Sequence, residues 1–147
     1  MIMISACLAG INCRYDGDDN LVKEILDIIN KKECVLVCPE QLGGLATPRY
    51  PSEIKGVING KKRVVNKKGL DVTENFYKGA YETLKIAELY KVDTAILKSR
   101  SPSCGFGKIY DGSFSSKLVR GNGITAELLK KKGIKIYTEE SINTLMK

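Results

Sequence analysis

Short apolar runs separated by polar and glycine-rich stretches recur along this chain of 147 residues. Apolar runs of about four to eight residues, bounded by turn residues, are typical of buried strands. Four runs predict such strands, at 2–6, Cys34–Val37, Thr94–Leu97 and 134–137. They are the expected framework of the fold.

Helical spacing of apolar residues is found between these runs. Asn20 is a candidate cap for a first helix, whose apolar positions are Val22, Ile25, Leu26 and Ile29. A longer helix is expected from Thr73, and its residues at helical spacing, expected in the core, are Tyr77, Ala80, Tyr81 and Leu84. Thr125 is a candidate cap for a helix that stops at Gly133, and 139–146 predicts a closing helix.

The stretch 56–66 predicts a β-hairpin, because Asn59-Gly60 joins two short apolar runs and favours a two-residue turn. We expect this hairpin at an edge of the sheet. The stretch 99–114 is expected to be a long functional loop. The order of elements predicts an α/β fold, with a mostly parallel sheet covered by helices and the hairpin as an insertion. Residues 1–147 are expected to form a single domain.

Composition and charge add little to this picture. The chain is 43% hydrophobic and has a formal net charge of +7. This charge suits an anionic partner, nucleic acid included, but the lysines cluster at expected turns and helix ends, without an RNA-binding aromatic motif. Solvated surface is the favoured interpretation. There is no apolar stretch of about eighteen residues and no signal-peptide pattern, so we expect a cytoplasmic protein without a membrane partner.

The five cysteines are the most informative residues. Cys7, Cys38 and Cys104 each stand just beyond a predicted strand. Because strand ends of an open α/β sheet gather at one edge, where ligands bind, we expect three thiolates on one rim. Such a set predicts a metal or cluster site. Cys13 lies in the loop after the first strand, whereas Cys34 opens the second strand and is expected to be a buried core thiol.

Missing residues and motifs narrow the chemistry. With no histidine in the chain, a Cys-His nucleophile and a histidine-ligated zinc are excluded. The cysteine spacings fit no zinc ribbon or finger, and there is no Cys-x-x-Cys pair. Thiolate-only sites select zinc or iron–sulfur clusters. Four ligands suit an electron carrier, whereas three leave one iron open to a substrate atom. The residues alone leave these choices open, together with inert core thiols.

Six segments are distinctive: SACLAGINCRYDG, VCPEQLGGLATPRYPSEI, GLDVTENFYKGA, AILKSRSPSCG, IYDGSF and GNGITAELL. In this order, and over nearly the whole chain, they resemble a bacterial and archaeal family that includes the thiouracil desulfidases. The resemblance implies a Rossmann-like, three-layer α/β domain with a 4Fe-4S cluster held by three cysteines. It also implies a non-redox, hydrolase- or lyase-like removal of sulfur from a thiolated nucleobase such as 2-thiouracil or 4-thiouracil, as hydrosulfide bound to the open iron.

Carried over by motif, the cluster ligands are Cys7 of SACL, Cys38 of CPE and Cys104 of SPSCG. Cys13 is expected near the cluster, as a neighbour of the ligands or a fallback ligand. Glu40 and Ser101 are the expected catalytic residues.

Glu40 is expected to move protons while the open iron polarises the thiocarbonyl for attack by water. The alternative is that Glu40 only pairs with Arg49. Ser101 could orient the substrate or water, or only shape the turn at Pro102. Both alternatives remain open at this stage.

Eight further residues are candidates for substrate contact: Arg14, Tyr15, Asp16, Gly43, Gly44, Arg49, Ser103 and Gly105. The glycines would let the backbone approach a planar ring, and Arg49 could bind a phosphate. The expected partner is a small thiolated nucleobase or nucleotide. Two other functions remain open: a basic nucleic-acid-associated module with a structural cysteine-ligated metal, and a desulfidase of a thiolated nucleotide or tRNA. The sequence predicts no oligomeric state.

Overall fold

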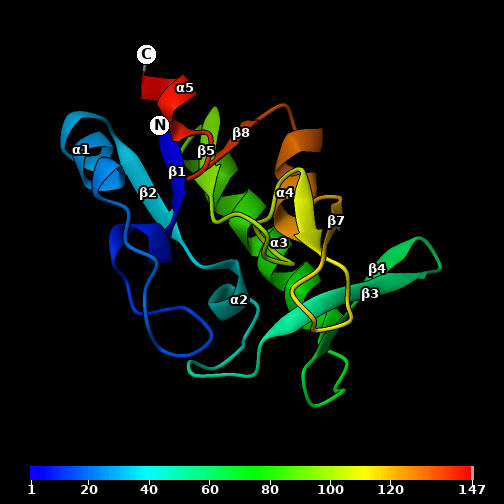
Figure 1. Cartoon of the computed structure of the whole chain (residues 1–147). Helices are drawn as coiled ribbons and strands as arrows, with labels where there is room; N and C mark the ends of the chain where they lie inside the picture. The colour runs from blue at the N-terminus through cyan, green and yellow to red at the C-terminus, as the bar shows by residue number, and fades with distance from the viewer. Residues whose placement is uncertain (147) are drawn as a thin grey trace.

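A four-stranded parallel sheet lies at the centre of the computed structural model, which describes residues 1–146 (Figure 1). Its strands are β1 (Ile2–Ser5), β2 (Cys34–Val37), β5 (Thr94–Leu97) and β8 (Lys135–Thr138). They lie in the order β2-β1-β5-β8, and every neighbouring pair is parallel. The four predicted strands are confirmed within one residue at each end. The predicted mostly parallel α/β fold is also confirmed.

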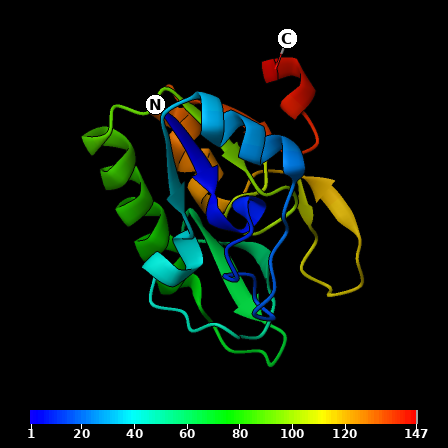
Figure 2. The same ribbon diagram turned by 90° about the vertical axis from the view of Figure 1, so that its left-hand side faces the viewer.

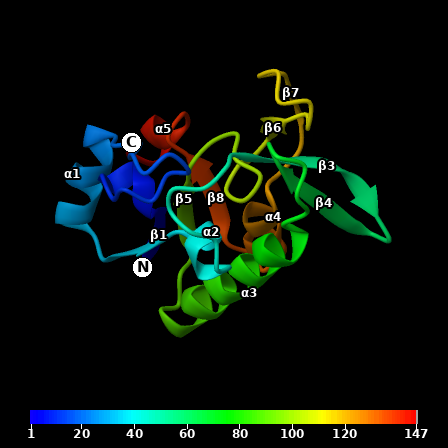
Figure 3. The ribbon, with the colours of Figure 1, turned by 90° about the horizontal axis from the view of Figure 1, so that it is seen from below.

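Helices cover both faces of this sheet and make three layers, as Figure 3 shows. On one face lie α1 (Lys23–Lys31) and α5 (Ile142–Met146), whose Ile25, Ile28 and Ile142 pack on β1 and β5. On the other lie α3 (Thr73–Leu89) and α4 (Ile124–Lys131), which share an apolar core with the sheet. Within residues 1–146 no helix is long and apolar enough to cross a membrane.

The predicted caps and two predicted core positions are wrong. Val22, not Asn20, precedes α1, and Leu26 is 40% exposed because Ile25 and Ile28 form the buried face. In α3 the buried face runs through Phe76, Ala80 and Thr83, so the side chain of Tyr81 points to solvent at 55% exposure.

The two threonines predicted as helix caps, Thr73 and Thr125, form hydrogen bonds with other segments instead. The Thr73 hydroxyl accepts a hydrogen bond from the backbone of Val64, and the buried Thr125 hydroxyl bonds to that of Ser103. Val72 and Gly123 occupy the cap positions.

The hairpin predicted at Asn59-Gly60 is confirmed but does not lie at an edge of the main sheet. β3 (Ser52–Ile58) and β4 (Lys61–Asn66) form a separate two-stranded sheet that projects from the domain (Figure 1). Asn59 and Gly60 both have positive φ, 52° and 78°, as a tight hairpin turn requires. The stretch 99–114 expected as a loop includes a strand, β6 (Lys108–Tyr110), which pairs with β7 (Leu118–Arg120) beyond that stretch to form a second hairpin; strands of three residues are too short to predict.

The order of strands opens a crevice at the carboxyl ends of β1 and β5. From β1 the chain passes to β2 on one side, and β5 joins on the other, so the loops after β1 and β5 run apart. Ligands of open α/β sheets bind at such a switch point. The Ser5 hydroxyl accepts a hydrogen bond of 2.9 Å from the Lys98 N–H and ties the two strand ends together. A 3-10 helix, η1 (Ala6–Ala9), follows β1 directly.

A short helix after β2, which the sequence patterns did not predict, is α2 (Pro39–Leu42). It lies against α3 with the two backbones in contact (Figure 2). A Cβ added at Gly79 would lie 1.9 Å from the Pro39 carbonyl oxygen, and one added at Gly43 would lie 2.0 Å from that of Asn75. Two glycines therefore set the position of the segment that carries Cys38 and Glu40.

This contact predicts a stability effect opposite to that of an ordinary helix substitution. In a helix interior, alanine is favoured over glycine by about 1 kcal/mol. We expect Gly79→Ala instead to lower the free energy of unfolding by about 3 kcal/mol, because the added methyl group overlaps the backbone of α2. Urea unfolding followed by circular dichroism measures this. Lys78→Ala, at an exposed position of the same helix, is the control and should match the wild type. A Gly79→Ala protein that is more stable than the wild type would contradict the contact.

Candidate functional site

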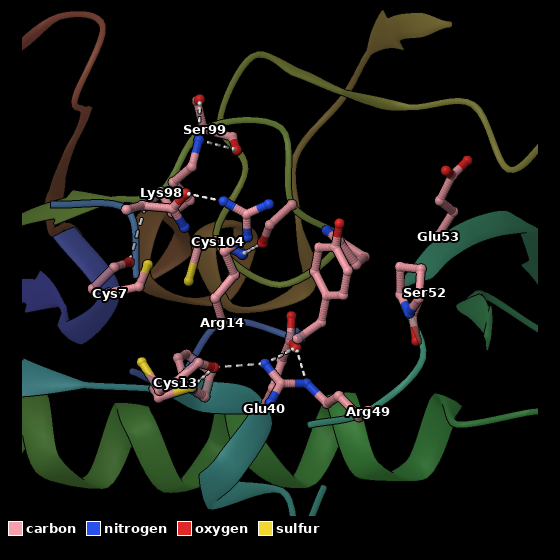
Figure 4. A pocket seen from close by; sticks show the side chains of 18 of the residues that line it. Cys7, Cys13, Arg14, Glu40, Arg49, Ser52, Glu53, Lys98, Ser99 and Cys104 are labelled. Atoms are coloured by element: carbon pink, nitrogen blue, oxygen red, sulfur yellow. Dashed lines mark hydrogen bonds and ion pairs between the residues drawn. The ribbon is translucent and has the colours of Figure 1, made fainter. Parts of the chain in front are cut away.

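A cavity of about 460 Å³ lies where the ends of β1, β2 and β5 meet (Figure 4). The segments that follow β1, β2 and β5 contribute four cysteines to its lining, Cys7, Cys13, Cys38 and Cys104. The two hairpins and their loops contribute a second wall, made of Ser52, Glu53, Lys67, Tyr110, Phe114 and Ser116. In Figure 4, Ser52 and Glu53 lie on the opposite side of the cavity from Cys7 and Cys13.

The three cysteines expected on one rim come from three different segments. Cys7 lies in η1, Cys38 lies between β2 and α2, and Cys104 lies in the loop after β5. All three line the cavity, whereas Cys34 lies outside it and packs, half-buried, near α1. Within residues 1–146, no three Cys, Asp or Glu side chains converge closely enough to hold a single metal ion. The thiols are instead spread over the wall of the cavity.

Cys13 lies between two of these thiols. It is 2% exposed, and its carbonyl oxygen accepts a hydrogen bond of 3.8 Å from the Cys38 thiol. The neighbouring Cys13 thiol is the main cause that lowers the pKa of Cys7, and it is also the main cause that lowers the pKa of Cys38 to about 7. Cys38 and Cys7 in turn raise the pKa of Cys13, so this thiol keeps its proton. At Cys104, burial raises the pKa of the thiol to about 12.

Glu40 and Arg49 form a short ion pair beside the cysteines. Arg49 Nε and Nη2 lie 2.7 and 2.6 Å from the same carboxylate oxygen, Glu40 Oε2. The two side chains are only 10% and 18% exposed. The ion pair between Glu40 and Arg49, considered above as the alternative role of Glu40, is therefore present.

The other donors of Arg49 are also occupied by the protein. Nη1 donates to Thr47 Oγ1 and the Ala46 carbonyl, and Nη2 also donates to the Cys13 carbonyl at 2.9 Å. Its guanidinium thus joins the loop after β1 to the segment after β2. With these donors bonded to protein oxygens, the structure gives no support to a phosphate at Arg49.

Ser101 shapes the loop that carries Cys104. Its hydroxyl oxygen accepts hydrogen bonds from the N–H groups of Cys104, at 2.6 Å, and Ser103, at 3.1 Å. This is the turn-forming role considered for Ser101. The residue also lines the cavity, so its hydroxyl hydrogen remains able to donate there.

A partly buried carboxylate, which sequence analysis missed, fixes the start of the same loop. Glu139, just after β8, accepts hydrogen bonds from Lys98 Nζ at 2.6 Å, from the Ser99 N–H at 2.7 Å and from the Ser99 hydroxyl at 2.9 Å. Lys98 and Ser99 line the cavity. No motif signalled Glu139, because it is 40 residues or more from its partners.

The remaining candidate residues are divided between the cavity and its surroundings. Arg14 and Tyr15 line it, and Asp16 forms a surface ion pair of 3.2 Å with Arg14. Five candidates lie outside the lining: Asp16, Gly43, Gly44, Ser103 and Gly105. Close packing occupies several of them, since Gly43 touches α3, Gly105 touches the Ser101 carbonyl and the Ser103 hydroxyl bonds to Thr125.

Comparisons with known proteins agree over nearly the whole chain. The family model of 2-thiouracil desulfurase matches residues 2–141. The uncharacterized protein YbbK of Bacillus subtilis (strain 168) is 44% identical, over 99% of this chain and 100% of that protein. The solved structure of a 4Fe-4S-dependent thiouracil desulfidase, TudS, superposes with a TM-score of 0.90 and 37% identity, covering 99% of this chain and 94% of that one.

The Glu139 contacts predict a pH-dependent contribution to stability. Burial alone would raise the pKa of Glu139, but hydrogen bonds from Lys98 and Ser99 outweigh it and hold the pKa below its ordinary value of 4.5. A carboxyl whose pKa is lower in the folded state stabilises the fold above the unfolded value, and this is lost as the pH falls through the folded value. We expect Glu139→Gln to reduce the free energy of unfolding by about 2 kcal/mol at pH 7. The difference from the wild type should shrink below about pH 4.5 in urea titrations.

The control for this experiment is Glu140→Gln, which removes the neighbouring exposed carboxylate. Glu140 forms a surface ion pair with Arg100, and both side chains are about half exposed. We expect a change of less than about 1 kcal/mol at either pH. Equal effects of the two substitutions would contradict the assigned role of Glu139.

Proposed function

The chain belongs to the 2-thiouracil desulfurase family, and from this premise we propose that Cys7, Cys38 and Cys104 hold the 4Fe-4S cluster of a thiouracil desulfidase. The reaction removes sulfur from a small thiolated nucleobase. The observation that carries the assignment of the ligands is that these three thiols line one cavity at the switch point of the sheet. We assign the activity to a single domain, since the family match spans residues 2–141.

The chemistry of the donors fits an iron–sulfur cluster. Clusters are held by thiolates, and a metal ligand must lose its proton. The lowered pKa values of Cys7 and Cys38 favour the thiolate form, and binding to iron would deprotonate the buried Cys104. The chain contains no histidine that could replace a cysteine ligand. Five free thiols suit a reducing compartment, which supports a cytoplasmic location.

We assign Cys13 as a hydrogen-bond donor to the ligands rather than as a fourth ligand. Cys13 lines the same cavity as Cys7 and Cys38, and these neighbours raise the pKa of its thiol, which favours the protonated form. Hydrogen bonds to ligand sulfurs tune the reactivity of a cluster. When bound by three cysteines, the cluster supplies an iron without a protein ligand, a Lewis acid for the thiocarbonyl sulfur.

Glu40 is the assigned proton carrier, and Arg49 determines which of its oxygens reacts. Both short contacts from Arg49 reach Oε2, and within residues 1–146 no hydrogen bond reaches Oε1. Oε1 is therefore the oxygen that takes a proton from the attacking water and gives it to the departing sulfur, which leaves as hydrosulfide. Arg49 restricts the rotation of the carboxylate, because it is itself held by the Thr47 hydroxyl and the Cys13 carbonyl.

Ser101 is assigned to orient the substrate or water. Its hydroxyl oxygen already accepts two backbone N–H groups, so its one hydrogen is left to donate into the cavity. An oxygen of the pyrimidine or the attacking water can accept it. The two roles considered for Ser101 are thus compatible, since the same hydroxyl shapes the turn and presents a directed donor.

The ligand assignment predicts which cysteines are needed for the cluster. After anaerobic reconstitution with iron and sulfide, Cys7→Ser, Cys38→Ser and Cys104→Ser should each lose most of the bound iron and sulfide and the visible absorbance. Cys13→Ser should retain them, because a hydroxyl can still donate to neighbouring sulfurs. The matched control is Cys34→Ser, a cysteine outside the cavity, which should equal the wild type. Zinc bound by the wild type in both aerobic and anaerobic preparations, with no iron, would contradict the proposal.

The proton-carrier assignment predicts a separation of cluster binding from turnover. Glu40→Gln should keep its iron and sulfide but lower kcat for 4-thiouracil by about 100-fold or more, since the amide cannot accept the proton. Arg49→Lys, which cannot reproduce the two-nitrogen contact with Oε2, should lower kcat by about tenfold. Steady-state release of hydrosulfide measures both. The control is Glu33→Gln, an exposed carboxylate before β2, and full activity in Glu40→Gln would refute the assignment.

A further inference from the structure

The loop between β6 and β7, residues 111–117, holds an aromatic ring at the cavity. The Asp111 N–H donates to the Lys117 carbonyl at 3.0 Å and closes the loop. Phe114 and Ser116 line the cavity from this loop. Both have left-handed backbone conformations, with φ of 56° and 62°, which are unfavourable for residues other than glycine.

A buried carboxylate on β3 holds this loop in place. Glu53 is 8% exposed, and its Oε1 accepts hydrogen bonds from the Gly112 N–H at 3.0 Å and the Phe114 N–H at 3.1 Å. Within residues 1–146, Glu53 takes part in no ion pair. The loop also touches β3 directly, because a Cβ at Gly112 would lie 2.7 Å from the Ile54 carbonyl oxygen.

Neither of these features stabilises the fold by itself. Burying a carboxylate is unfavourable unless hydrogen bonds replace its water, and a left-handed phenylalanine persists only where its surroundings hold it. Here the loop N–H groups of Gly112 and Phe114 supply the hydrogen bonds that the buried Glu53 carboxylate needs, and these bonds hold the strained loop in place. As a result Phe114 lies at the cavity wall. Backbone strain maintained in this way is concentrated at ligand-binding sites.

We propose that the thiolated pyrimidine stacks on the ring of Phe114, and that Glu53 is the positioning residue for this ring. The proposal rests on the proposed function, which places the cluster at the cysteine side of the cavity. Figure 4 shows Glu53 on the side opposite Cys7 and Cys13, so a planar substrate between them meets the hairpin wall. Stacking uses the π-face of the ring and not its substituents. Phe114 therefore contributes equally to binding of 2-thiouracil, 4-thiouracil and the product uracil.

The test compares binding with turnover in the reconstituted full-length protein under anaerobic conditions. Calorimetry gives the Kd of uracil, and hydrosulfide release gives KM and kcat for 4-thiouracil. Phe114→Leu, which is apolar but lacks a ring face, should raise Kd and KM by about tenfold and leave kcat within about twofold. Phe114→Tyr should bind like the wild type. Tyr81→Leu, which removes an exposed aromatic ring that is not part of the cavity lining, is the control.

The positioning role of Glu53 has its own pair of variants. Glu53→Ala keeps the ring but releases the loop, so it should raise Kd and KM as Phe114→Leu does. Glu53→Gln should bind like the wild type, because its amide oxygen still accepts both N–H groups. A substitution that only weakened the fold would lower the unfolding temperature without this separation of KM from kcat.

Three outcomes would overturn the inference. They are an unchanged Kd in Phe114→Leu, an unchanged Kd in Glu53→Ala, and equal weakening by Glu53→Gln and Glu53→Ala. Should Phe114→Leu fail to fold, the two Glu53 variants and Phe114→Tyr decide the question. Failure of the proposed function gives a different result: a wild-type protein with a full cluster would release no hydrosulfide from 4-thiouracil. The Kd of uracil in the variants would still test the stacking on Phe114.

Discussion

The reversal of strand order between β1 and β5 is the constraint on which the site depends. Because β2 joins β1 on one side and β5 joins it on the other, the loops after β1 and β5 separate and leave an opening at the carboxyl edge of the sheet. The Ser5 hydroxyl, bonded to the Lys98 N–H, keeps the two strand ends together beneath this opening. Three cysteines that are far apart in the sequence therefore line one cavity.

Charged side chains hold the walls of this cavity by bonding to one another and to the backbone. Arg49 joins Glu40 to the Cys13 carbonyl, and Glu139, just after β8, holds Lys98 and Ser99 at the start of the loop after β5. On the hairpin wall, Glu53 has the same role through two backbone N–H groups. A site held in this way is formed before substrate binds, so binding does not have to order its groups. The thiols and the aromatic wall are thus presented from opposite sides of one cavity.

Much of the framework was predictable from local patterns, and the errors have identifiable causes. The four core strands are apolar runs that any parallel sheet would bury, and the Asn59-Gly60 turn requires positive φ at both residues. Tyr81 was misplaced because apolar spacing defines a helix face only within a residue or so. The helix α2 has four residues and no periodicity to detect, although its contact with α3 through Gly43 and Gly79 positions Glu40.

The sequence by itself determined the strands, the tight turn, the thiol-only donor set and the family motifs, because these depend on residue types and short spacings. Only the tertiary structure decided that Arg49 binds Glu40 Oε2, that the Cys13 carbonyl accepts from the Cys38 thiol, and that Glu53 and Phe114 reach the cavity. Glu53 and Phe114 are 61 residues apart in the chain. No local pattern encodes such a contact, since it exists only once two separately formed hairpins pack over the sheet.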